Sequence, residues 1–253
     1  MKKEIDQGKI DGEISFVFCN REPGEFEGSD TFFRIVEDEY RIPLVCLSSR
    51  KHRAQRDERS SRHQWRPEYD REVMKLLQPF KSDLCVLAGY MLVVGEEMCR
   101  KYDMINLHPA APGGPTGTWQ EVIWQLIETG AQESGVMMHL VIPELDRGPP
   151  LTYCLFSIRG KPFDESWKEI SGQSVELLQR EQSETNTLFK LIRQHGLARE
   201  FPLIVATLNA FSEGKVRIKN GQVIDSHDQL VNDYDLTKEI DKIVGEIGSS
   251  PPS

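Results

Sequence analysis

The stretch MINLHPAAPGGPTGTW, residues 104–119, sets the interpretation of the whole chain. Its first five residues predict a short β-strand that ends at Pro109, because proline cannot donate to the hydrogen-bond ladder of a sheet. Side chains two positions apart on a strand lie on the same face, so Asn106 and His108 point the same way. Two polar side chains are therefore expected to converge where a strand ends.

Short strands of this kind alternate with helical patterns through the first two thirds of the chain. Apolar runs predict strands at 13–19, 42–47, 84–89, 104–108 and 135–142. Between them, helices are predicted near 29–40, 68–78, 95–102 and 118–129. Such alternation is typical of a mostly parallel sheet with helices on both faces. We therefore expect an α/β, Rossmann-like fold.

The last third of the chain departs from this alternation. Residues 151–158 follow the preceding strand too closely for a parallel return, so they predict an antiparallel neighbour at the edge of the sheet. One or two helices are expected over 163–196, with Asp164 as the cap and Gly196 as the stop, and another over 199–214. Asn220-Gly221 predicts the turn of a hairpin. Residues 226–253 are polar and predict a frayed C-terminal tail.

Composition narrows the class of function. The 253 residues carry 38% hydrophobic side chains and a net charge of −9, which argues against nucleic acid or an anionic membrane as the main partner. The start of the chain does not resemble a signal peptide, and no run reaches the roughly 18 apolar residues of a membrane span, so a cytoplasmic location is expected. The 5 cysteines are scattered without a CxxC or Cys/His cluster, which predicts reduced thiols and no metal site.

One strongly basic run, SRKHRAQRDERSSRHQWR, covers residues 49–66. It is typical of a solvated loop, as most charge runs are. It is also compatible with a lid or an anion-binding loop near a site. The sequence leaves both interpretations open.

Three segments are expected to end at the carboxyl edge of the sheet, where open α/β sheets bind their ligands: 86–91, 106–109 and 143–149. There the Asn106 amide and a protonated His108 could hold an oxyanion that develops at an acyl carbon. Asp146 could orient the imidazole or take up a proton. The pattern predicts acyl transfer without a serine or cysteine nucleophile.

Each of these residues also has a purely structural interpretation. Asn106 could satisfy the backbone of a neighbouring loop, and Asp146 stands where a turn before Gly148-Pro149 would favour an aspartate. His139, inside an apolar run, is typical of a hydrogen-bonded core histidine rather than of an acid or base.

Taken together, the motifs VLAGYM (86–91), INLHPAAPGGPTG (105–117) and SGVMMHLVIPELDRGP (134–149) resemble the folate-dependent formyltransferases. The resemblance runs from about Ser15 to Ile158. It is strongest to the branch of the family that formylates glycinamide ribonucleotide in purine biosynthesis. It implies the formyltransferase fold, 10-formyltetrahydrofolate as the formyl donor, an amine acceptor that is a ribonucleotide, and neither a metal nor a covalent enzyme intermediate.

The resemblance also assigns roles to individual residues. It implies a catalytic triad of Asn106, His108 and Asp146. The pterin end of the folate would be held by two segments: Met91, Leu92 and Val93, and Pro143, Glu144 and Leu145. RPEYDREV resembles a family motif that places an arginine near the mouth of the site, so substrate contacts are expected at Arg66, Gly89 and Pro109.

Several departures from the family pattern leave the acceptor open. The formyltransferase domain is expected over 1–225, beginning after the first strand and the glycine-rich phosphate loop of the family. Leu92 stands where the family has an arginine, and Arg147 where it has a glycine. The alternatives are another amine acceptor, water as in formyl-folate hydrolysis, or a folate-binding homologue without catalysis. The sequence does not predict the oligomeric state.

Overall fold

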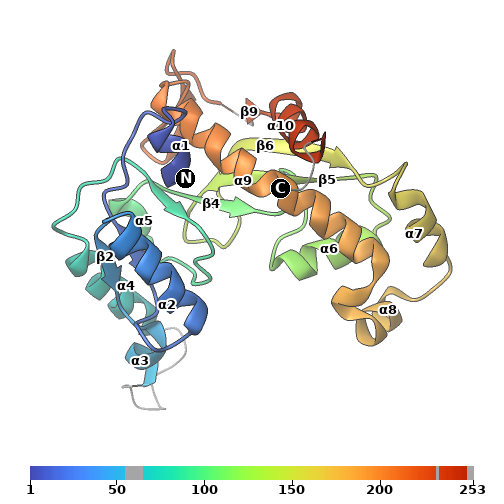
Figure 1. Ribbon diagram of the computed structural model, residues 1–253, viewed down its shortest axis with the longest axis horizontal. Helices are drawn as coiled ribbons and strands as arrows, with labels where there is room; N and C mark the ends of the chain where they lie inside the picture. Colours follow the sequence, from blue (N-terminus) through green and yellow to red (C-terminus); the bar gives the residue numbers. More distant parts are fainter. Residues whose placement is uncertain (55–64, 232–233, 250–253) are drawn as a thin grey trace. The chain divides into compact units, whose positions relative to one another are not determined.

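A computed structural model describes residues 1–54, 65–231 and 234–249, and Figure 1 labels many of its helices and strands. The chain forms two compact units. The first comprises Met1–Ile105 and Val141–Leu145, and the second Asn106–Leu140 and Asp146–Ser253. Strand β4 (Met104–His108) begins in the first unit and ends in the second. The two units are described separately below.

The first unit alternates strands and helices as the sequence predicts. Its elements are α1 (Lys2–Asp6), β1 (Val17–Cys19), α2 (Glu27–Arg34), the π-helix η1 (Ile35–Glu39), β2 (Leu44–Cys46), α3 (Ser49–Ala54), α4 (Trp65–Leu76), β3 (Cys85–Leu87) and α5 (Glu96–Lys101). β1 and β2 are parallel, with Val17 opposite Leu44. A parallel pair needs a crossover connection, which α2 and η1 provide.

The core of this unit is built on one face of α4. Tyr69, Val73 and Leu77 recur at helical spacing, and all three are buried. They pack in a cluster with Val94 and Met98 from α5 and the segment before it. The Tyr69 hydroxyl donates to the carbonyl of Leu47 at 2.6 Å, so its polar end is satisfied although its ring is buried.

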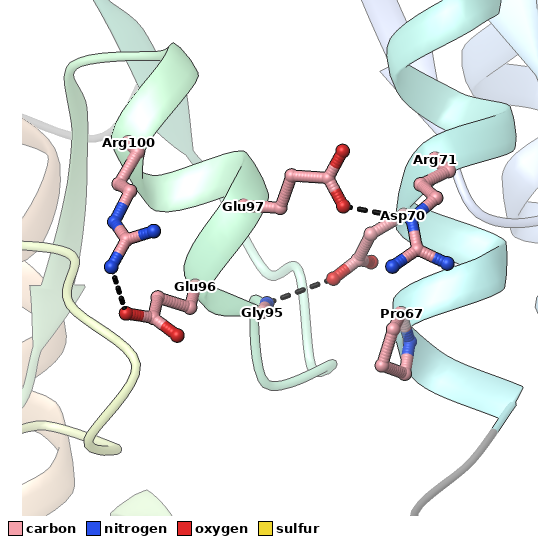
Figure 2. Close-up of a pocket in the computed structure, with 7 residues that line it drawn as sticks. All are labelled: Pro67, Asp70, Arg71, Gly95, Glu96, Glu97 and Arg100. Carbon is pink, nitrogen blue, oxygen red and sulfur yellow. Dashed lines mark hydrogen bonds and ion pairs between the residues drawn. The ribbon is translucent and has the colours of Figure 1, made fainter.

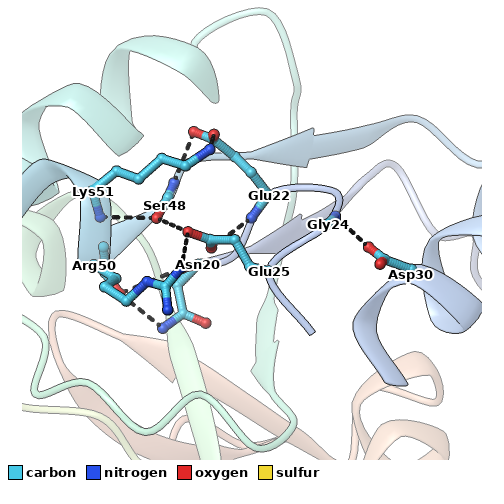
Figure 3. A network of polar contacts seen from close by, with 9 residues as sticks. Asn20, Glu22, Gly24, Glu25, Asp30, Ser48, Arg50 and Lys51 are labelled. Carbon is cyan, nitrogen blue, oxygen red and sulfur yellow. Dashed lines mark hydrogen bonds and ion pairs between the residues drawn. The ribbon is translucent and has the colours of Figure 1, made fainter. Parts of the chain in front are cut away.

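Polar side chains close the turns that follow β1 and β2 (Figure 3). The Glu25 carboxylate accepts a hydrogen bond from the Ser48 hydroxyl at 2.6 Å. Glu22 accepts from the Ser48 backbone N–H at 3.2 Å and pairs with Lys51 at 2.7 Å. The Lys51 hydrogen bond lowers the pKa of Glu22. Both carboxylates are therefore engaged by groups of the protein itself.

The second unit contains the end of β4 and the remaining elements. These are α6 (Trp119–Glu128), β5 (Glu133–Leu140), β6 (Pro150–Ser157), α7 (Phe163–Glu169), α8 (Val175–Glu181), the 3₁₀-helix η2 (Ser183–Thr185), α9 (Thr187–Ser212), β7 (Val216–Lys219), β8 (Gln222–Asp225), β9 (Tyr234–Asp235) and α10 (Thr237–Ser249). Within this unit the strand order is β4-β5-β6-β9. β5 and β6 are antiparallel, with Glu133 opposite Ser157, which confirms the predicted antiparallel neighbour, but β6 is not the edge strand, because β9 lies outside it.

Helix α9 differs from the prediction. Gly196 does not end a helix there, because α9 runs through both Gly196 and Pro202. Its buried residues recur every three or four positions, and the helix packs on β5 and β6. Burial of this long apolar stripe outweighs the local cost of the glycine and the proline. Asp164 is not a cap either: Pro162 precedes α7, and the Asp164 carboxylate accepts from the Gly160 N–H at 2.8 Å.

The C-terminal region is more ordered than the sequence predicts. The hairpin β7–β8 is present, with Asn220 and Gly221 both at positive φ as a type I′ turn requires. The predicted frayed tail is wrong for the residues of β9 and α10. β9 pairs with β6, and Ile240 of α10 is fully buried. Polar residues dominate this segment, but a few apolar ones are enough to dock it.

The predicted α/β class is confirmed, with a mixed sheet that contains the antiparallel pair β5–β6 and, beyond it, the parallel pair β6–β9. Of the basic run, residues 49–54 form α3 and residues 65–66 begin α4, whereas 55–64 lie outside the described residues. Its two interpretations therefore stay open. Among the described helices, none is both long enough and apolar enough to cross a membrane.

Candidate active site

The three predicted catalytic residues belong to the second unit. Asn106 and His108 lie on β4, and Asp146 lies in the loop between β5 and β6. His108 Nδ1 is 3.7 Å from Asp146 Oδ2, and their side chains are only 3% and 9% exposed. The backbone of Asp146 has a φ of 53°, in the left-handed region that aspartate tolerates better than most residues. The predicted proximity of His108 and Asp146 is confirmed.

His108 has an oxygen near each ring nitrogen. Its Nε2 lies 2.8 Å from the Pro115 carbonyl, which can only accept, so this nitrogen carries a hydrogen. Its Nδ1 faces the Asp146 carboxylate. A hydrogen on Nδ1 would point toward the negative carboxylate, whereas a lone pair there would be set against its charge. The hydrogen on Nε2 is inferred from its hydrogen bond to Pro115.

A second histidine, His139 on β5, reaches the same carboxylate. Its Nε2 lies 3.7 Å from Asp146 Oδ1 and 3.3 Å from Asn106 Nδ2. Its Nδ1 lies 3.0 Å from the Leu140 carbonyl and therefore donates, which leaves Nε2 to accept from the Asn106 amide. Burial lowers the pKa of His139 and favours the neutral ring.

Asp146 is thus flanked by two imidazoles with different hydrogen-bond partners. The prediction of a buried, hydrogen-bonded His139 is confirmed, but the sequence did not predict that it would contact Asn106. An amide group has two N–H donors, so Asn106 can give one to His139 and keep the other for a ligand. The available signal was the position of His139 at the end of the strand that precedes the Asp146 loop.

Gly148 holds the Asp146 loop against the end of β5. A Cβ at Gly148 would lie 1.6 Å from the Leu140 carbonyl oxygen, so only glycine fits. Asp146 lies two residues before this close approach. The Leu140 N–H donates to the Pro149 carbonyl at 3.0 Å, while the Leu140 carbonyl faces His139. The backbone of Leu140 therefore bonds both to the loop that carries Asp146 and to His139.

The predicted folate-side residues belong to the first unit. Their large apolar side chains are unusually accessible: Met91 is 76%, Leu145 57% and Val93 46% exposed. Arg66 donates to the Val93 carbonyl and lies 3.2 Å from Asp70, so its observed contacts are within the protein. Leu92 packs against the core cluster of this unit. The ligand roles of all these residues, and those of Pro143, Glu144, Gly89 and, in the second unit, Pro109, stay predictions.

An α/β fold that sets a buried His–Asp pair and an amide donor at a strand end has the donors that could hold a developing oxyanion without a protein nucleophile. The comparisons with known proteins give the particular family. The family described as formyl transferase matches residues 3–159, and the chain belongs to this family.

Similar proteins agree with this placement. Phosphoribosylglycinamide formyltransferase of Saccharomyces cerevisiae is 31% identical over 103 residues, which cover 38% of this chain and 48% of that protein. The Escherichia coli protein of the same name is 33% identical over 90 residues, covering 33% of this chain and 40% of that one. The matched regions span about half the length of these curated relatives or less.

Solved structures share the fold. Phosphoribosylglycinamide formyltransferase of Coxiella burnetii superposes with a TM-score of 0.63 at 21% identity, covering 92% of this chain and 90% of that one. A formyltetrahydrofolate deformylase of Pseudomonas putida gives a TM-score of 0.57 at 16% identity, covering 88% of this chain and 63% of that one. At these identities the likeness establishes the fold and leaves the acceptor of the formyl group open.

Proposed function

We propose that this chain transfers a formyl group from 10-formyltetrahydrofolate to the amine of glycinamide ribonucleotide. The observation that carries the proposal is the Asp146 carboxylate set 3.7 Å from both His108 and His139, with Asn106 bound to the latter. The family, and relatives described as phosphoribosylglycinamide formyltransferases, support it.

In this mechanism the acceptor amine attacks the formyl carbon, and negative charge develops on the formyl oxygen. Asn106 donates its second amide N–H to that oxygen. His108 donates from Nε2, exchanging the Pro115 carbonyl for the developing oxyanion. Two preorganised donors in a buried site stabilise the transition state more than the ground state, because the charge they meet exists only there.

Asp146 has two roles in the proposed reaction. Its charge stabilises the imidazolium of His108 across 3.7 Å. It also serves as the base that removes the proton released by the attacking amine, a proton that N10 of the departing tetrahydrofolate finally accepts. His139 stays neutral in this mechanism because burial lowers its pKa, and its Nε2 accepts a hydrogen bond from Asn106. A neutral His139 does not compete with His108 for the negative charge of Asp146.

The exposed apolar side chains of the first unit fit the formyl donor as a substrate. Met91, Val93 and Leu145 present the kind of surface on which an aromatic ring system packs. Leu145 is joined directly to Asp146 in the chain. A folate bound against Leu145 would therefore contact the residue next to Asp146, which supports His108 in this mechanism.

The experiment combines the full chain with 10-formyltetrahydrofolate, with and without glycinamide ribonucleotide, and follows release of tetrahydrofolate and formylated amine. We expect release that depends on the amine and falls by about 10²-fold or more in His108→Ala. Equal release without the amine would assign the chain to hydrolysis instead. Unchanged transfer in His108→Ala would refute the mechanism.

A further inference from the structure

The carboxylate of Asp70 lies buried between α4 and the segment that enters α5 (Figure 2). Its side chain is 2% exposed. Oδ2 accepts a hydrogen bond from the Gly95 N–H at 2.8 Å, and Oδ1 lies 3.2 Å from Arg66 Nη2. A Cβ at Gly95 would come within 2.8 Å of Oδ2, so this approach depends on a glycine there.

Arg66 holds the same segment at a second point, Val93, two residues before Gly95. It stands one helical turn before Asp70, and its Nη2 also donates to the Val93 carbonyl. The guanidinium lies 5.1 Å from the Trp65 ring centroid and 5.5 Å from that of Tyr69, which fixes its direction. Arg66 and Asp70 together therefore hold the backbone of Val93 and Gly95 against α4.

This backbone needs such support. Residues 88–95 form neither helix nor strand, so no regular hydrogen-bond ladder fixes them. Burial raises the pKa of Asp70, while Arg66 and the Gly95 N–H act in the opposite direction. A charge buried at this cost stays ionised only through these two partners.

We propose that Asp70 is a positioning residue for the formyl donor: through Arg66 and the Gly95 amide it fixes the segment Met91–Val93 in the shape that receives the apolar ring of the folate. The inference rests on the proposed function, because that function assigns Met91–Val93 to the folate. Asp70 itself touches no substrate. Its effect is to lower the entropy that the segment would lose on binding the folate.

A neighbouring ion pair provides a matched control. Arg71, next to Asp70 on α4, lies 2.8 Å from Glu97 of α5, and both line the same 430 Å³ pocket as Asp70 (Figure 2). These side chains are 54% and 59% exposed. Like Asp70, this pair connects α4 with α5, but the structure shows no contact between it and the segment Met91–Val93. An exposed ion pair of this kind contributes little.

The experiment compares wild type, Asp70→Asn and Arg71→Gln in the full chain. Calorimetry measures the Kd of a stable 10-formyl-dideazafolate analogue, and steady-state kinetics give KM for the formyl donor and kcat. We expect Asp70→Asn to raise Kd and KM about 10-fold or more, the scale of one lost charged hydrogen bond, with kcat within about 3-fold. Arg71→Gln should change Kd less than about 2-fold.

The outcomes separate this inference from the proposed function. Wild type that binds no analogue overturns both. Wild type that binds, with Asp70→Asn binding equally well, overturns the inference alone, as does a loss confined to kcat with KM unchanged. Should Asp70→Asn not fold, Gly95→Ala tests the same contact with Arg66 in place, because its Cβ would lie 2.8 Å from Asp70 Oδ2 and displace the carboxylate. Weakened analogue binding by folded Gly95→Ala is expected, and wild-type binding by it refutes the proposal.

Discussion

Replacing Asp146 with asparagine removes one charge from the site and little else. Asparagine is nearly isosteric with aspartate and also tolerates the φ of 53° at this position. The change therefore tests the carboxylate rather than the loop. With the negative charge gone, the imidazolium that the proposed mechanism places at His108 would face a neutral amide instead of a carboxylate 3.7 Å away.

The size of the effect follows from this distance. Two unit charges about 4 Å apart interact by about 4 kcal/mol at an effective dielectric constant of about 20. Part of this is lost to solvent and to reorientation of the amide, and removal of a general acid or base typically costs about 10²–10⁴-fold. We expect Asp146→Asn to lower the single-turnover rate of formyl transfer about 10²–10³-fold.

Binding and stability should change little. Calorimetric titration of the folate analogue should give a Kd within about 3-fold of wild type, and the Tm should move by less than about 4 °C, which corresponds to about 1 kcal/mol for a chain of this size. Asp164→Asn is the control, because it makes the same change at an exposed aspartate of the same unit, whose carboxylate accepts from the Gly160 N–H. Wild-type turnover in Asp146→Asn would show that the carboxylate only shapes its turn, and the role of His108 as an imidazolium would fall with it.

Three further substitutions test the surroundings of the site. Because burial lowers the pKa of His139 in the folded state, wild type should lose stability as the pH falls from about 6.5 through that lower pKa. His139→Gln should reduce this loss, by at most about 1.4 kcal/mol of unfolding free energy per pH unit. Urea unfolding of both proteins at pH 7.5, 6 and 5 measures it, and the same pH dependence in both would contradict the prediction. Gly148→Ala should lower the Tm by about 6 °C or more, since its Cβ would meet the Leu140 carbonyl oxygen at 1.6 Å, and an unchanged Tm would argue against this close approach. Gly245→Ala, in α10 with open space around it, should instead raise the unfolding free energy by about 0.5–1 kcal/mol, and a loss would count against the docked helix.

The sequence predicted those elements whose signals are local. The Asn220-Gly221 turn and the short connection between β5 and β6 each specify their geometry within a few residues, and both were predicted correctly. Helix α9 was predicted in two pieces because Gly196 is a local stop signal. Its continuity comes from packing on β5 and β6, which no window of the sequence contains.

The same distinction applies to the site. Strand-end reasoning placed His108 and Asp146 together, because alternation along a strand and the edge of a sheet are general geometry. The contact between His139 and Asn106 was missed, since it depends on which strands are neighbours and in what register. The tether of Asp70 to Gly95 was missed for a similar reason: it joins a helix to a segment without regular structure.

The turn that follows β4, rich in proline and glycine (residues 109–115), bears on the proposed catalysis. The turn returns the Pro115 carbonyl to within 2.8 Å of His108 Nε2, so the donor proposed for the oxyanion is already satisfied and aimed. A neutral formyl oxygen is no better an acceptor than this carbonyl, so exchanging one for the other gains little in the ground state. An oxyanion is a much stronger acceptor for a charged donor. In the proposed mechanism the exchange therefore becomes favourable only as charge develops, and the Pro115 carbonyl would make His108 selective for the transition state.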